Sequence, residues 1–193
     1  PQKDYPLVDC RNNKKWLMAI KPDYHTNLFP DSILRTESPL MLDDIPPTNS
    51  IYKVYVGGYY GFSDVSAGDS IIIYRTSDNR GPAWHRAVAT SLCSVVEVRA
   101  ASSFDSEGEF ITYCQNHSIF AADELKKHFQ KRHYAVKLSY NLAFPKRPTR
   151  GDLITHGIIS GEGYTGLRPL TEQGFKKALE LGEVREGFVI HQA

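Results

Sequence analysis

A Gly-Asp turn that leads directly into a short apolar strand constrains the fold of this chain more than any other feature. The segment reads Ala67-Gly68-Asp69-Ser70-Ile71-Ile72-Ile73-Tyr74-Arg75-Thr76. Gly permits the backbone angles of a tight turn, and Asp supplies side-chain hydrogen bonds to the backbone. Ile71–Tyr74 is too short for a helix and rich in β-branched and aromatic residues, so it predicts a core strand. Its Tyr-Arg-Thr end is either an ordinary solvated strand end or the wall of a binding site.

Composition places the chain among soluble globular proteins, because 41% of its 193 residues are hydrophobic and 23% are charged. Nothing approaches the ~18 consecutive apolar residues of a membrane span, so we expect no membrane partner. The three cysteines, Cys10, Cys93 and Cys114, are widely spaced and form no metal-binding motif. We therefore expect no metal or cofactor, buried free thiols at Cys93 and Cys114, and a reducing, cytoplasmic location.

Alternation and turn residues predict the remaining strands, and capping residues predict the helices. Strands are expected at Lys15–Lys21, Ile51–Val56, Ala87–Val98, Tyr134–Phe144 and Gly187–His191. Helices are expected after Ser106, Thr149 and Thr171 and over Ala122–Lys131, with a short one near Pro30-Asp31 and a loop over Pro39–Ser50. Strands separated by turns, without regular βαβ alternation, predict an α+β fold. We expect a mixed pseudo-β-barrel of five or six strands with peripheral short helices.

The domain organisation follows from the polarity of the N-terminal segment. Residues 1–14 are polar and irregular, which predicts a linker or an expression remnant. Residues 15–193 are expected to form one domain with a helical C-terminal extension.

No standard catalytic motif occurs in the sequence. The seven histidines are scattered, and the adjacent pair Asp43-Asp44 lies in a Pro-rich loop where two carboxylates seldom converge across a cleft. We therefore expect binding rather than catalysis.

Aromatic and basic residues are interleaved along the chain, a pattern that suits stacking on bases with charge contacts to phosphates. Residues 126–150 contain eight Lys or Arg and no Asp or Glu, whereas residues 101–125 contain five acidic and no basic residues. This asymmetry is consistent with a polyanionic partner. Two simpler explanations remain open, namely the preference of Tyr for strands and the electrostatics of a helix with acidic residues first and basic residues last.

The order of these pieces resembles the PUA-like superfamily, which includes the EVE and ASCH domains. The Gly-Asp step before Tyr74 carries the resemblance, together with the strands around it. The segments 20–32, 74–76 and 144–148 are similar to PUA-like tails of bacterial GNAT-type acetyltransferase proteins. The resemblance covers about residues 15–182 and implies RNA or DNA binding, with a modified or flipped base in a cavity.

Residue by residue, the resemblance implies a pocket lined by Lys21, Tyr24, Lys53, Tyr55, Tyr74, Arg75 and Thr76, with Trp84, His85 and Arg86 on the loop above it. A basic patch is expected from Lys131, Arg132, Lys146, Arg147 and Arg150. The chain lacks the Gly-x-Lys-x-x-x-x-Arg signature of typical ASCH domains, so amidohydrolase activity does not carry over. It also lacks the pyrophosphate loop of an acetyltransferase, so such a domain would lie upstream of Pro1.

Three functions remain open at this point. The first is a nucleic-acid-binding module with a concave pocket for a modified or flipped base. The second is a regulatory protein-interaction domain attached to an acetyltransferase. The third is a small nucleoside-type hydrolase that uses an unidentified Lys or His as its base.

Overall fold

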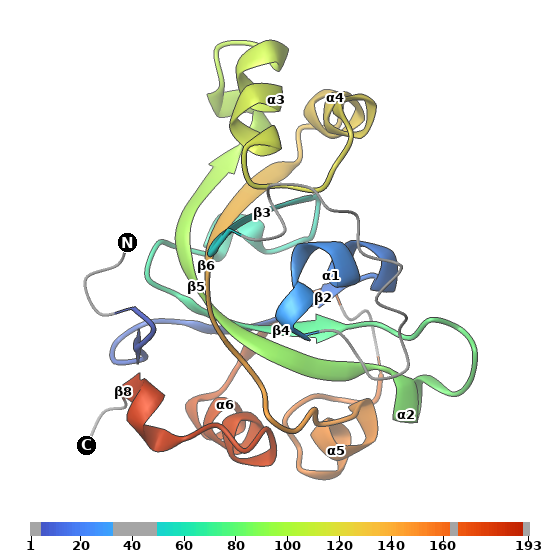
Figure 1. Ribbon diagram of the computed structural model, residues 1–193, viewed down its shortest axis with the longest axis vertical. Helices are drawn as coiled ribbons and strands as arrows, with labels where there is room; N and C mark the ends of the chain where they lie inside the picture. The colour runs from blue at the N-terminus through green and yellow to red at the C-terminus, as the bar shows by residue number, and fades with distance from the viewer. Residues whose placement is uncertain (1–4, 33–49, 163–165, 191–193) are drawn as a thin grey trace.

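One six-stranded sheet organises the fold (Figure 1). The structure is a computed structural model that describes residues 5–32, 50–162 and 166–190. The main strands are β2 (Lys15–Ile20), β3 (Tyr52–Gly57), β4 (Ser70–Arg75), β5 (Val88–Ala100), β6 (Tyr134–Ala143) and β7 (Leu167–Leu170). Their order is β3-β6-β5-β4-β2-β7, with β2 and β4 parallel and every other pair antiparallel. The strands predicted over residues 15–21, 51–56, 87–98 and 134–144 are confirmed with small changes at their ends. Of the strand predicted over residues 187–191, only Val189–Ile190 is extended, and His191 lies outside the described residues.

The long strand β5 curls the sheet. Its pairing with β6 shifts register at Leu92/Cys93 and again at Val95/Glu97. Bulges of this kind bend a strand and increase its twist, so β5 passes from one part of the curled sheet to the other (Figure 1). This is the bent strand that the sequence predicted, and it gives the mixed sheet the curl expected of a pseudo-barrel.

The Gly-Asp turn is held by the buried carboxylate of Asp69. It accepts hydrogen bonds from Trp16 Nε1 at 2.9 Å, from the Ser66 amide at 2.9 Å and from the Lys14 amide at 3.1 Å. Gly68 has φ of +91°, a left-handed conformation that favours glycine. The turn therefore joins the starts of β2 and β4, which run side by side.

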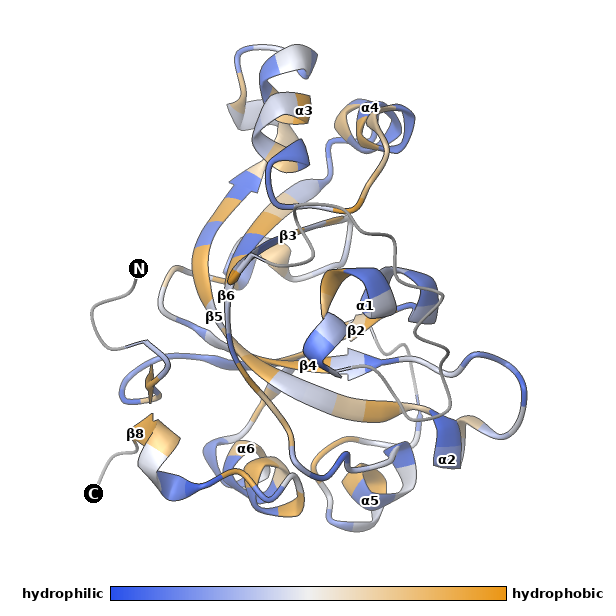
Figure 2. Cartoon of the chain, in the orientation of Figure 1, coloured by the Kyte–Doolittle hydropathy of each residue, from blue (hydrophilic) through white to orange (hydrophobic). Residues whose placement is uncertain are grey.

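Two apolar cores lie on opposite faces of the sheet. The first fills the inside of the curl and contains Met18, Ile71 and Ile73. The second lies between the other face and the C-terminal helices, and it contains Ile72 and Tyr74. Hydrophobic residues concentrate in the strands, whereas the loop after β4 is hydrophilic (Figure 2). Ile71–Tyr74 is therefore a strand buried on both faces, as the sequence predicted.

Residues 8–10 pack into the folded unit, although they lie in the segment 1–14 for which the sequence predicts a linker. β1 (Val8–Asp9) pairs in parallel with β8 (Val189–Ile190). Val8 and Cys10 are each 1% exposed and pack in the second core. The residues around Val8 and Cys10 are mostly polar, so the sequence pattern does not indicate that these two side chains are buried.

The helices surround the sheet and confirm the predicted caps. They are α1 (Pro22–Leu28), α2 (Ala83–Arg86), α3 (Glu107–Gln115), α4 (Ala122–Gln130), α5 (Arg150–Thr155) and α6 (Glu172–Leu181), with a short 3₁₀ turn, η1, at Pro30–Ser32. The side chains of Ser106, Thr149 and Thr171 cap α3, α5 and α6. α3 and α4 pack at one end of the molecule, while α2 and α5 lie toward the other (Figure 1).

The structure also bears on the expectations for the cysteines, for the loop over residues 39–50 and for a membrane span. Cys93 and Cys114 are buried free thiols, as predicted, and so is Cys10. Apart from Ser50, the loop expected over Pro39–Ser50 lies outside the described residues, as does the pair Asp43-Asp44. Among the described residues, no helix combines the length and apolarity needed to cross a membrane.

Candidate nucleic-acid interface

The curled sheet has one end at which α1 and η1 sit among the strand termini. Strand register places the last residues of β2, β4 and β6 at this end, together with the first residues of β5 and β3. We call this end the mouth. Most of the predicted site residues fall here, but α1 and η1 divide the space into two hollows.

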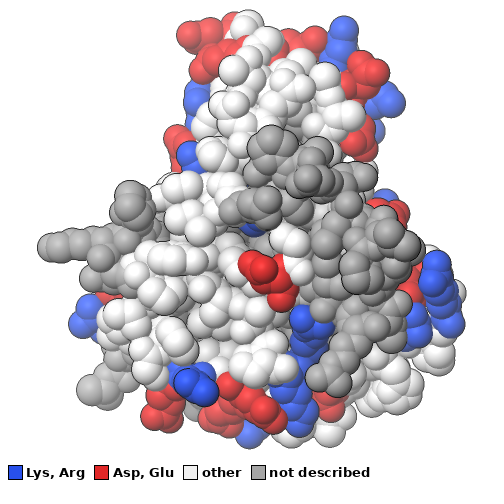
Figure 3. All heavy atoms as spheres, viewed as in Figure 1, with Lys and Arg blue, Asp and Glu red and all other residues white. Residues whose placement is uncertain are grey.

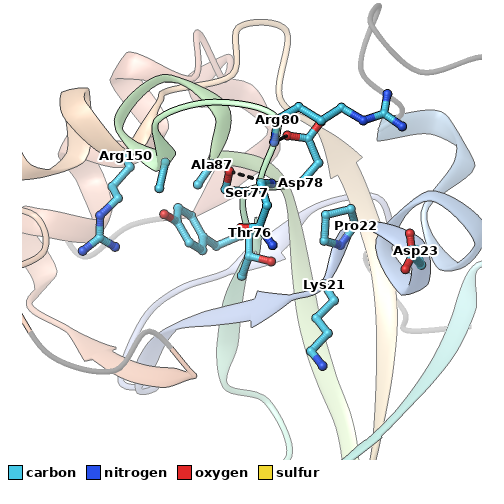
Figure 4. A pocket seen from close by; sticks show the side chains of 12 residues that line it. Lys21, Pro22, Asp23, Thr76, Ser77, Asp78, Arg80, Ala87 and Arg150 are labelled. Carbon is cyan, nitrogen blue, oxygen red and sulfur yellow. Dashed lines mark hydrogen bonds between the residues drawn. The ribbon is translucent and has the colours of Figure 1, made fainter.

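The larger hollow, which we call the outer cleft, has a volume of about 560 Å³. It is lined by Lys21, Pro22, Asp23, Tyr74, Thr76, Ser77, Asp78, Asn79, Arg80, Ala83, Ala87 and Arg150. Figure 4 shows that Lys21, Arg80 and Arg150 line it from three separate segments, with their charged ends pointing in different directions. The cleft thus gathers Lys21, Tyr74 and Thr76 with one member of the expected basic patch.

Neighbouring residues at the end of β4 point to opposite faces of the sheet. Tyr74 packs in the second core beside the outer cleft, where it is 1% exposed, and Arg150 hydrogen-bonds to it. Arg75 is 3% exposed and lies near His25 on the α1 side. Because successive side chains of a strand point to opposite faces of the sheet, Tyr74 and Arg75 cannot line the same pocket. The single pocket that the sequence predicted is therefore split at this point.

The smaller hollow, which we call the lysine pocket, has a volume of about 240 Å³. Its walls include Phe29, Tyr140 and the N-terminal Tyr5, and its polar groups come from Asp31, Ser50 and Lys53. Ile51 and Pro30 complete the lining. The pocket combines aromatic walls with hydrogen-bonding groups.

Lys53 is the most unusual group in this pocket, because it is a lysine that is only 2% exposed. Burial lowers its pKa from 10.5 to about 8, and the nearby Asp31 opposes that change only in part. Burial likewise raises the pKa of Tyr140, whose hydroxyl lies 3.0 Å from Ser32 Oγ. Lys53 is thus an ammonium donor at neutral pH, held in an environment that destabilises its charge.

A second polar group lies deeper in the mouth. His25 is fully buried, with Nε2 2.8 Å from Thr90 Oγ1. Burial, with help from the positive charges of Arg75 and Arg147, lowers the pKa of His25 to about 3. The imidazole is therefore neutral under ordinary conditions, which excludes a role as a cationic phosphate ligand.

Besides Arg75, two further predicted pocket residues line neither hollow. The Tyr24 ring stacks on Phe120 at 4.8 Å, and its hydroxyl donates to Glu124 at 2.8 Å. The Tyr55 hydroxyl donates to Tyr59 at 3.0 Å. Both therefore belong to the packing between the sheet and the α4 region.

The expected basic patch is divided along β6. Lys131 and Arg132 precede this strand, whereas Lys146, Arg147 and Arg150 follow it. A ten-residue strand spans about 33 Å, so the two groups cannot form one local patch. Figure 3 shows Lys and Arg side chains at both ends of the molecule, mixed with acidic residues.

The loop residues Trp84, His85 and Arg86 form α2 at the edge of the outer cleft. Arg86 donates two hydrogen bonds to the carboxylate of Asp78, at 2.6 and 2.5 Å. These bonds hold the pKa of Asp78 well below its usual range. Trp84 is 45% exposed.

Sequence reasoning did not identify Phe29, Asp31, Ser32 and Tyr140 as site residues. Phe29, Asp31 and Ser32 lie in the segment that carried the resemblance, and Tyr140 is an inward residue of an alternating strand. Only the curl of the sheet brings Tyr140 against Ser32, which is 108 positions away in sequence.

Comparison with known proteins shows that this chain shares its fold with solved ASCH structures. No protein-family model and no curated protein sequence matches the chain. Among solved structures, a mutant of the ASCH protein from Zymomonas mobilis superposes with a TM-score of 0.57 at 10% identity, covering 88% of this chain and 97% of that one. A hypothetical protein from Leishmania major gives 0.54 at 12% identity, with 89% and 96% covered.

Human THYN1, solved in complex with DNA containing 5-methylcytosine, gives a TM-score of 0.50 at 14% identity, with 90% of this chain and 99% of that chain covered. At these identities the likeness concerns the fold, and the resemblance to PUA-like domains that the sequence predicted is confirmed at that level.

Proposed function

We propose that this chain is a nucleic-acid-binding module that holds one base, flipped or modified, in the lysine pocket. The observation that carries the proposal is the buried Lys53, which lines one hollow together with the aromatic residues Phe29 and Tyr140. A base pocket needs a surface for stacking and polar groups for the base edge. Here the rings provide the first, while the ammonium of Lys53 and the carboxylate of Asp31 provide a donor and an acceptor.

The shared fold supports this proposal, because human THYN1 carries a similar fold and has been solved with DNA containing 5-methylcytosine. A charged donor such as Lys53 favours a base edge rich in acceptors. A buried cation also costs stability, and such a group is typical of functional sites. The cytoplasmic location, a single domain with a helical C-terminal extension and an upstream acetyltransferase are parts of the same proposal that come from the sequence alone.

The test is binding of fluorescently labelled oligonucleotides, as RNA and as DNA, each with one unmodified or modified base such as 5-methylcytosine. Wild-type protein should prefer one base, and Lys53→Met and Asp31→Ala, which remove the donor and the acceptor, should reduce that preference about tenfold or more. Lys126→Met, at an exposed lysine on α4, is the matched control and should change nothing. If both pocket variants keep the affinity and preference of the wild type, the lysine pocket is not the base site.

The lysine pocket also favours a second function, the nucleoside-type hydrolase. A lysine whose pKa is lowered to about 8 can act as a general base near neutral pH. Incubation with acylated or otherwise modified nucleosides should then release product with wild-type protein and not with Lys53→Met. A panel without any product would exclude this function for the compounds tested.

A further inference from the structure

Trp84 presents an indole ring to solvent at the edge of the outer cleft. It is 45% exposed, whereas Trp16, the other tryptophan of the chain, is 6% exposed and bonded to Asp69. The Trp84 indole lies against Gly151 so closely that a Cβ atom on Gly151 would overlap with it. Gly151 thus leaves room for this ring at the start of α5, and an exposed ring of this kind is a stacking surface for a base.

The charges of the outer cleft favour an anion. Lys21, Arg80 and Arg150 contribute positive charge, and no carboxylate lies within ion-pair distance of them among the described residues. Of the two acidic residues in the lining, Asp78 is already bonded to Arg86. The cleft therefore keeps a net positive charge next to the exposed ring of Trp84.

The outer cleft and the lysine pocket lie on two sides of one short segment. Residues 21–23 line the cleft, and residues 29–31 line the pocket, with α1 between them. A seven-residue helix rises about 10 Å, and a stacked strand advances about 3.4 Å per nucleotide. If one base lies in the pocket, a nucleotide about three positions along the same strand would then reach the cleft.

We propose that the outer cleft and Trp84 bind the single-stranded nucleotides that flank the pocket base. This inference rests on the function proposed above. The cations contact phosphates and Trp84 stacks on a base. The preferred partner is a single strand, because a base in a single strand reaches the pocket without the cost of unpairing.

The test uses the intrinsic fluorescence of Trp84, since Trp16 is shielded. Titration with single-stranded RNA and DNA of two, four and eight nucleotides should quench the emission for the longer strands, and Trp84→Phe should abolish this change. Arg80→Ala and Arg150→Ala should each weaken binding severalfold and reduce the slope of log affinity against log salt by about 0.7 per lost phosphate contact. Lys126→Ala removes the same charge from α4 and should alter neither quantity.

Absence of quenching by the eight-nucleotide strand, or unchanged affinity and salt slope in Arg80→Ala, would overturn the inference, as would tighter binding of a blunt duplex. Arg80 is an exposed loop residue, so its variant tests the cleft even if Arg150→Ala disturbs α5. The two proposals fail separately. Loss of base preference in Lys53→Met alone supports the pocket without the flanking site, whereas weakening in the cleft variants alone supports the reverse.

Discussion

Replacement of Lys53 by methionine should make the protein more stable near neutral pH while removing its base preference. Lys53 is 2% exposed, and burial lowers its pKa from 10.5 to about 8. Between these two values the unfolded chain holds a proton that the folded chain has lost. Stability therefore rises with pH across this interval. Below pH 8 both states are charged, and the folded state bears the whole cost of the buried ammonium.

The size of this cost follows from the two pKa values. They differ by about 2.5, and each pKa unit is worth 1.36 kcal/mol, so the cost is about 3 kcal/mol at pH 7. It falls below about 1 kcal/mol at pH 10, where Lys53 is neutral in the folded state and largely charged in the unfolded one. Methionine replaces the unbranched apolar stem of the lysine and removes the charged group, so Lys53→Met should recover most of this free energy at pH 7.

Urea unfolding of wild type and Lys53→Met at intervals from pH 7 to pH 10 measures the effect. The stability difference in favour of the variant should shrink by about 2 kcal/mol over this range. Other titrating groups are shared by both proteins and cancel. Lys126→Met should show no such trend. A variant that is less stable than wild type at pH 7, with a difference independent of pH, would refute the reasoning and would mean that the Lys53 ammonium is fully compensated in the fold.

Three further predictions concern the scaffold. Gly182→Ala should lower stability by about 1–3 kcal/mol in urea unfolding, because the new methyl group would overlap with the buried ring of Phe144; a neutral effect would show that Phe144 can move. Asp69→Ala should cost about 2–4 kcal/mol, because it leaves Trp16 Nε1 and two backbone amides without their acceptor, and an unchanged unfolding midpoint would contradict this. His25 should show no NMR titration between pH 5 and 8, because burial lowers its pKa to about 3. Below pH 6.5 only the unfolded chain takes up this proton, so the free energy of unfolding should fall by up to about 1.4 kcal/mol per pH unit. His25→Gln should remove this pH dependence.

Local signals were sufficient to predict most of the fold. Alternation located β3 and β6, and side-chain caps located α3, α5 and α6, because these features depend on residues within a few positions of one another. The short strands β1 and β7 were not predicted, because they depend on pairing with residues far away in the sequence. β7 contains Pro169 and pairs only at the edge of the sheet, opposite residues about 150 positions away.

The candidate site was harder to predict because it depends on which way a strand faces. Tyr74 and Arg75 are neighbours in sequence, and the resemblance placed both in one pocket, but the sheet separates them. The hydrogen bond between Ser32 and Tyr140 has no local signature at all. It requires the curl that the bulges of β5 produce, and single-sequence patterns do not report bulge positions.

Lys53 shows that one part of the site was nevertheless visible in the chain. Alternation in Ile51–Val56 puts Lys53 on the same face as Ile51 and Tyr55, and this face turns inward. A lysine on the buried face of a strand is costly unless a partner or a function offsets the cost. The stability measurement on Lys53→Met separates these two explanations. A structural partner would make the variant less stable, whereas a group retained for ligand binding would make it more stable and unable to discriminate between bases.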